Sequence, residues 1–317
     1  MGMRIDLDKV FDLFLELQKE HLVSAYKGLT NRPKKLYVVQ KKSEEVNAYA
    51  ESGDEVDHIV LYSGLLMEIA KNVISICHID SKKKNGLGVS WSESYFLETV
   101  LLMLYMSTFF IVAHEFSHIY YGHCDYLRSN MDLSKIDLFG KEISPVAPLD
   151  YQALEMCADA GAICMYVDKV MAELDSAKNL ALWGYPMTLS YCLAAFHVVF
   201  YTLRKNDGGK IASKIRLESH PPLFLRHLQC ISTCGHYMNK NYPDICDDPK
   251  FQILYSFYET EELLKQETGF GFSASDIGQN IQQVAYEHEK VLIDHWKNSI
   301  GEKLLCHARI RLPRMEQ

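Results

Sequence analysis

Two histidines and a glutamate form the strongest chemical pattern in this sequence. His114 and His118 are four residues apart, and Glu115 directly follows the first histidine. Residues four apart in a helix lie on one face, so both imidazoles can reach one metal ion. Glu115 would project beside them, where a carboxylate can take a proton from metal-bound water. The pattern also occurs by chance, so the surrounding sequence decides how it is interpreted.

A second segment offers carboxylates that would complete a metal site. Glu155 and Asp159 are also four apart, and most of their neighbours over 154–163 are apolar. Carboxylates on a buried helix need partners, whereas a solvated acidic pair would need none. Glu155 would complete a His/His/Glu set of the kind that leaves a fourth position for water. Asp159 could accept the second ring N–H of a metal-binding histidine.

Long apolar helices are expected to carry both patterns. A helix over 92–121 would hold the histidines, and a helix over 151–172 would hold the carboxylates. The apolar stretch 100–113 is shorter than a bilayer span, and a further stretch, 187–203, is at the lower edge of that length. Buried core helices are the favoured interpretation of both stretches, and membrane association is the alternative.

Short strand patterns precede the histidine helix. They cover residues 36–40, 47–50 and 58–62, with polar or glycine-bearing turns between them. Residues 127–149 contain two prolines and are expected to be irregular. The expected fold class is therefore α+β, mostly helical, with a small β-sheet beside the helix of His114. The edge of such a sheet can pair with an extended peptide.

Composition narrows the functional class. The chain has 317 residues, enough for one large domain with a sizeable core, and its formal net charge is −8. A negative chain is not expected to bind nucleic acid, which requires a basic face. The nine cysteines form no C-x-x-C pair, and the first ten residues are charged where a signal peptide is apolar. We therefore expect a cytoplasmic protein without a disulfide framework.

Four motifs stand in order along residues 47–226 of the chain. They are Asn47-Ala48-Tyr49-Ala50 with Ser63-Gly64-Leu65-Leu66, then HEFSHIYYGH from His114 to His123, then the E-x-x-x-D pattern from Glu155 to Asp159, and finally His220-Pro221-Pro222 with Arg226. This series resembles the motifs of gluzincin metallopeptidases of the CAAX-prenyl-protease and HtpX type. Their order is much more specific than any one of them.

The resemblance implies a fold, a metal and a class of substrate. It implies a zincin-like catalytic domain over residues 1–226 that binds Zn²⁺ through His114, His118 and Glu155. The substrate would be a protein or peptide, hydrolysed by a metal-activated water with Glu115 as the base. Residues 227–317 carry no matching motif, and we expect a helical C-terminal region packed on the catalytic domain.

The resemblance also assigns residues that would act on the carbonyl oxygen of the substrate. His220 would stabilise the negative charge of the transition state, and Arg226 would contact a substrate carbonyl or fix a carboxylate near the metal. The usual membrane helices of the family are not clear in this sequence. Its length and its balance of apolar and charged residues are more similar to those of the Lit-type phage-exclusion peptidases, a related intracellular group. That similarity implies a narrow protein target and a role in phage defence.

A protein that binds metal without catalysis is the alternative function. Such a protein would act as a sensor and bind a partner through the same cleft. A closed site with four protein ligands would support it, whereas three protein ligands plus water would support an enzyme. His123 is the nearby candidate for a fourth ligand. Glu115 favours the enzyme, because a structural zinc site needs no base.

Overall fold

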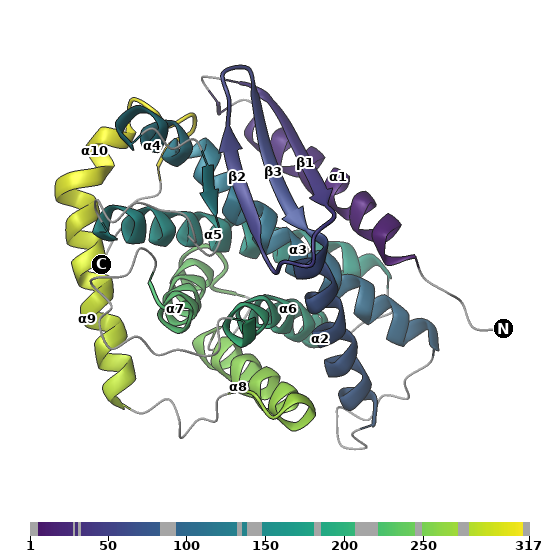
Figure 1. The fold of residues 1–317 in the computed structure, drawn as a ribbon. Coiled ribbons are helices and arrows are strands. Elements are labelled where there is room, and N and C mark those ends of the chain that lie inside the picture. Colours follow the sequence, from purple (N-terminus) through teal and green to yellow (C-terminus); the bar gives the residue numbers. More distant parts are fainter. Residues whose placement is uncertain are drawn as a thin grey trace.

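The computed structural model describes residues 6–27, 29–30, 33–82, 93–131, 135–137, 148–180, 185–206, 221–244, 249–271 and 279–312. Within these ranges the chain is mostly helical with one small β-sheet, so the expected α+β class is confirmed. Figure 1 shows the sheet and α1 (Leu7–Tyr26) on one side of the helices and α9 (Gln279–His295), in yellow, on the other.

The sheet lies over the helix that carries the histidines. Its strand order is β1-β3-β2-β4, with bounds Lys35–Lys41, Val56–Tyr62, Ala48–Ser52 and Lys135–Asp137 in that order. β1 pairs in parallel with β3, while β2 runs antiparallel to both β3 and β4. In β1, Leu36 and Val38 are buried and Tyr37 and Val39 are exposed. This alternation is typical of an edge strand with one face on the core.

Helix α1 is amphipathic and is held against the core by its buried face. Phe11, Leu15 and Leu22 recur on one side of the helix and are buried. Gln18 on the same face donates from Nε2 to the Tyr105 carbonyl oxygen at 2.9 Å. The polar group is therefore buried with a partner, which links α1 to the long helix behind it.

Helix α3 (Glu93–Tyr120) is the central helix of the fold. It contacts α1, α2 (Ser63–Lys82), α5 (Pro148–Leu180) and α6 (Tyr185–Asn206). Among the described residues, its segment 94–120 is the one helix apolar and long enough to cross a membrane, and 67% of its most apolar window is buried. A helix that is apolar on all sides needs such neighbours. The apolar stretch 187–203 lies in α6, where most side chains are also buried.

The C-terminal part of the described chain is helical. It contains α7 (Leu223–Asn241), α8 (Pro249–Thr268) and α9, then a π-helical turn over Trp296–Ile300 and α10 (Gly301–Leu304). The domain boundary expected after residue 226 falls inside α7. This helix contacts α5 and α6 as well as α8 and α9, so it joins the two regions as one packed element.

The expectation of irregular structure over 127–149 was wrong for its described part. Helix α4 (His123–Met131) extends into this range, and β4 follows it. Nothing in the local pattern indicates α4, because its stability comes from distant contacts. Arg128 donates from Nη1 to the Ser52 carbonyl oxygen of β2 at 3.1 Å, and Asp125 accepts from Ser52 Oγ at 2.9 Å. Tertiary contacts of this kind override weak local propensity.

Candidate metal centre

A glycine lets α5 approach the end of α3 closely. A Cβ atom at Gly161 would lie 2.7 Å from the Tyr121 hydroxyl oxygen and 2.8 Å from Ser117 Oγ. Both separations are shorter than van der Waals contact, so a side chain at this position would displace the Tyr121 ring and the Ser117 hydroxyl or push the helices apart. The missing side chain therefore allows the carboxylates of α5 to reach the histidines of α3.

The three predicted ligands converge in one buried group. His114 Nε2 and His118 Nε2 are 3.1 Å apart. Glu155 Oε2 lies 3.5 Å from His114 Nε2, Glu155 Oε1 lies 3.3 Å from His118 Nε2, and each side chain is 1% exposed. Zinc ligands about 2.0–2.1 Å from a tetrahedral centre are roughly 3.3–3.4 Å from one another. The observed spacings therefore match the edges of a tetrahedral zinc site.

Asp159 and Arg226 support this group from its outer side. Arg226 in α7 donates from Nε to Asp159 Oδ2 and from Nη2 to Asp159 Oδ1, both at 2.8 Å. Its Nη1 is 2.9 Å from Glu155 Oε2. Burial alone would raise the pKa of Asp159, but Arg226 and His114 hold that pKa below its usual range. Arg226 thus fixes both carboxylates beside the cluster.

The contact of Asp159 with His114 orients the imidazole. Asp159 Oδ1 is 2.9 Å from His114 Nδ1. An ionised carboxylate accepts hydrogen bonds and does not donate them, so the tautomer of His114 with its hydrogen on Nδ1 is the one that fits this contact. His114 Nε2 then presents its lone pair to His118 and Glu155. This is the arrangement expected when a carboxylate orients a metal-binding histidine.

His123 contacts the opposite nitrogen of His118. Its Nδ1 lies 3.0 Å from His118 Nδ1, the nitrogen that faces away from Glu155. Burial lowers the pKa of His118 to about 4, and burial and His118 together lower the pKa of His123 well below its usual range. Both rings are therefore neutral at neutral pH, and one hydrogen is shared between the two Nδ1 atoms. Within the described residues, His123 is a neighbour of a ligand and not a member of the group of three.

Of the remaining predicted site residues, the structure describes Glu115 but not His220. Glu115 is fully buried. Burial of the Cys124 thiol and the nearby charge of Glu115 together raise the pKa of that thiol well above its usual range. His220 lies outside the described residues, so its role stays a prediction. His227, next to Arg226, is turned toward α6 instead, where its Nε2 is 2.9 Å from His197 Nδ1.

Residues near the C-terminus fix the end of α3. Gly122 has a φ of 80°, and a Cβ atom there would lie 2.6 Å from the backbone nitrogen of Ala308. The Arg309 N–H donates to the Tyr120 carbonyl oxygen at 2.8 Å. The Arg309 guanidinium is buried in an ion pair with Asp57 of β3. No sequence pattern predicted this contact, which joins residues 252 positions apart.

Comparison with protein-family models, with curated proteins and with solved structures found no match to this chain. The resemblance to gluzincin peptidases therefore rests on the four motifs. The group formed by His114, His118 and Glu155 stands on its own geometry, since its ligand atoms all lie within 4.8 Å of one another.

Proposed function

We propose that this chain is a zinc-dependent metallopeptidase with a zincin-like catalytic centre. The observation that carries the proposal is the convergence of His114, His118 and Glu155 in one buried group. Three protein ligands of this kind leave a fourth position for water, as in catalytic zinc sites, whereas structural sites are closed by four. The order of the four motifs adds support, because it pairs this ligand set with Glu115 as a base.

The chemistry of the donor atoms supports a bound cation. With its hydrogen on Nδ1, which faces Asp159, His114 offers a lone pair at Nε2. When His118 donates its Nδ1 hydrogen to His123, His118 Nε2 offers a second lone pair, and the Glu155 carboxylate offers more. Buried acceptors without a shared hydrogen repel one another, and a divalent cation among them removes that repulsion. The mixed nitrogen and oxygen set with tetrahedral spacing suits zinc.

The residues around the group have distinct roles in hydrolysis. Zinc, when bound, polarises a peptide carbonyl and makes water more acidic. Glu115 accepts the proton of the attacking water and passes it to the leaving nitrogen. Arg226 holds Glu155 and Asp159 in position and keeps Asp159 ionised. His220 donates to the oxygen on which negative charge develops, which lowers the barrier more than it strengthens substrate binding.

The proposed substrate is a protein or peptide of the cytoplasm. The resemblance to Lit-type peptidases supports a narrow target and a role in phage defence. The net charge of −8 argues against nucleic acid as a partner. A polypeptide needs an opening beside α3 and α5 to reach the cluster, because its three ligands are each 1% exposed.

That burial favours the second candidate function, a metal-binding protein or sensor that does not hydrolyse peptides. A metal enclosed by protein has no room for a polypeptide backbone. The position of His123 favours the enzyme instead, because its ring contacts His118 Nδ1 and does not join the ligand group. The two functions predict the same metal content and differ only in turnover.

Expression of wild type and Glu115→Gln, with mass spectrometry of newly cleaved cell proteins, tests the peptidase. The amide keeps the shape of the side chain but cannot act as a base, so cleavage should fall by about 100-fold or more while zinc is retained. Glu302→Gln, the same change at an exposed position in α10, is the matched control. Cleavage by Glu115→Gln at the wild-type rate would contradict the proposed base. Zinc-loaded wild type that cleaves nothing would favour the sensor.

A further inference from the structure

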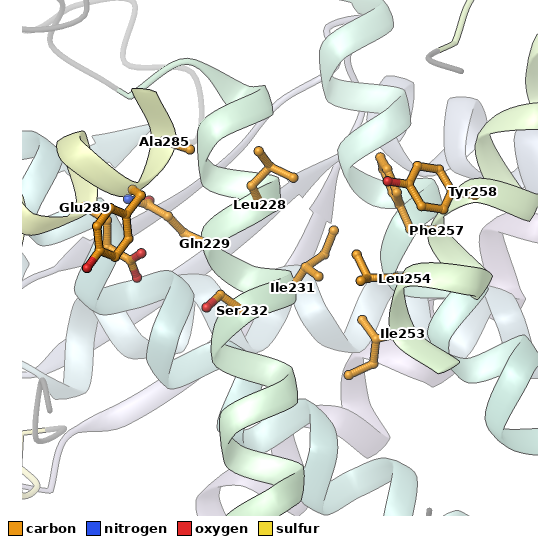
Figure 2. A pocket seen from close by; sticks show the side chains of 11 residues that line it. Leu228, Gln229, Ile231, Ser232, Ile253, Leu254, Phe257, Tyr258, Ala285 and Glu289 are labelled. Carbon is orange, nitrogen blue, oxygen red and sulfur yellow. The ribbon is translucent and has the colours of Figure 1, made fainter. Parts of the chain in front are cut away.

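A cavity lined by none of the residues of the candidate metal centre has no part in the proposed hydrolysis. It encloses about 350 Å³ and lies between α7, α8 and α9, as Figure 2 shows. Its apolar lining includes Ile231 of α7 and Ile253 and Phe257 of α8. Cavities of roughly 300–1,000 Å³ with mostly apolar walls and a few polar groups are typical of small-molecule sites.

Gln229 gives the cavity a polar group without a partner. The side chain is 6% exposed, and neither Oε1 nor Nε2 has a hydrogen-bond partner in the described protein. Figure 2 shows it reaching from α7 toward Glu289 of α9. A buried amide with its donor and acceptor both unsatisfied destabilises a folded protein and is rare. A ligand with the complementary donor and acceptor would remove that penalty.

The cavity has one polar end and one apolar end, and it opens to solvent. Glu289 lies at the polar end with Gln229, and burial raises the pKa of Glu289 although His236 opposes the shift. Leu254 and Tyr286 at the rim are 39% and 53% exposed. A molecule can therefore enter without unfolding α8 or α9, with its apolar part toward α8 and its polar part toward α9.

We propose that this cavity binds a small, largely apolar molecule whose polar end is a carboxamide, or a ring edge with the same adjacent donor and acceptor. The ligand carbonyl oxygen accepts a hydrogen bond from Gln229 Nε2, and the ligand N–H donates to Gln229 Oε1. The apolar part packs against Phe257 and Ile231. The site is separate from the proposed zinc centre, so its occupation requires neither metal nor proteolysis.

Ligand-observed NMR with two isosteric probes on the full chain tests this pairing. 2-Naphthamide carries the donor and the acceptor, whereas 2-acetonaphthone replaces the NH₂ group by a methyl group of similar size. The ketone leaves Gln229 Oε1 buried and unpaired, so it should bind about tenfold more weakly than the amide. Equal affinity for the two probes, or no binding of the amide, would overturn the proposal.

Substitutions in α7 and α9 test whether the preference for the amide probe arises from Gln229. Gln229→Leu should abolish the difference between the probes and should melt at the wild-type temperature or above, because two unpaired polar atoms are removed. Gln283→Leu makes the same change at an exposed position of α9 and should leave the preference intact. A preference for the amide that survives Gln229→Leu would place the ligand elsewhere and overturn the proposal. Should Gln229→Leu fail to fold, Ala285→Phe fills the cavity and should block both probes, and unchanged binding would refute the site.

Discussion

Replacing Arg226 with methionine should strongly destabilise the metal-free protein. Arg226 is 1% exposed and donates to Asp159 twice and to Glu155 once, at 2.8–2.9 Å. Methionine keeps much of the volume but removes the charge, which leaves two buried carboxylates facing each other. Removing one partner of a buried ion pair costs about 3–5 kcal/mol, so the free energy of unfolding should fall by that amount.

Two further variants separate lost charge from lost packing. Asp159→Asn in the Arg226→Met background removes one of the unpaired carboxylates and should recover about 1–3 kcal/mol relative to Arg226→Met alone. Arg226→Lys keeps the positive charge, but lysine cannot form the bidentate contact that arginine makes with Asp159. The free energy of unfolding of Arg226→Lys should therefore lie between those of wild type and Arg226→Met.

Urea unfolding in the presence of a chelator measures these differences. Circular dichroism and tryptophan fluorescence should give coincident transitions, which is the condition for comparing free energies. Excess zinc should reduce the deficit of Arg226→Met, because a cation beside Glu155 compensates part of its charge. A metal-free Arg226→Met protein within about 1 kcal/mol of wild type would refute the assignment of Arg226 as the counter-ion of the cluster.

Three other predictions follow from single contacts. Asp159→Asn should weaken zinc affinity by roughly 10- to 100-fold, measured against a competing chelator, because the hydrogen on His114 Nδ1 loses its ionic acceptor; unchanged affinity would make Asp159 merely structural. His197→Phe should flatten the acid dependence of stability. Burial lowers the pKa of His197 from 6.5 to about 3, so below pH 6.5 the unfolded chain binds a proton that the folded chain does not. Through this residue, the free energy of unfolding of wild type should therefore fall by about 1.4 kcal/mol for each unit by which the pH is lowered. Urea unfolding between about pH 7 and 5 measures this fall, and equal slopes for wild type and His197→Phe would contradict the prediction. Gly161→Ala should lower the free energy of unfolding by about 1–3 kcal/mol, because its methyl group meets the Tyr121 hydroxyl, and a neutral effect would mean that α5 can shift freely.

Spacing within single helices was sufficient to predict both halves of the candidate site. The histidines of α3 and the carboxylates of α5 each recur at an interval of four, and helix geometry alone puts each pair on one face. Apolar neighbours on both helices then indicated that these faces are buried. The three strands before α2 were likewise predicted, because alternation and turn residues are local signals.

Contacts between distant parts of the chain had no such signal. The sequence marked Arg226 as a motif residue but left open whether it contacts substrate or a carboxylate, and only the packing of α7 on α5 decides this. His123 was considered as a fourth ligand, whereas the turn at Gly122 directs its ring to the far nitrogen of His118. Arg309 and Gln229 belong to no motif. Their importance comes from burial, which depends on the tertiary fold.

Zinc content tests the central claim most directly. Purified wild type, His114→Ala and His236→Ala should be dialysed against a weak chelator, and the metal per chain should then be measured by mass spectrometry. His236 is exposed in α7, and its Nδ1 lies 2.9 Å from the Ser232 carbonyl oxygen of the same helix, so His236→Ala is the matched control. We expect one zinc ion per chain in wild type and in His236→Ala, and almost none in His114→Ala. Undiminished zinc in His114→Ala, or no zinc in wild type, would contradict a metal centre at His114, His118 and Glu155.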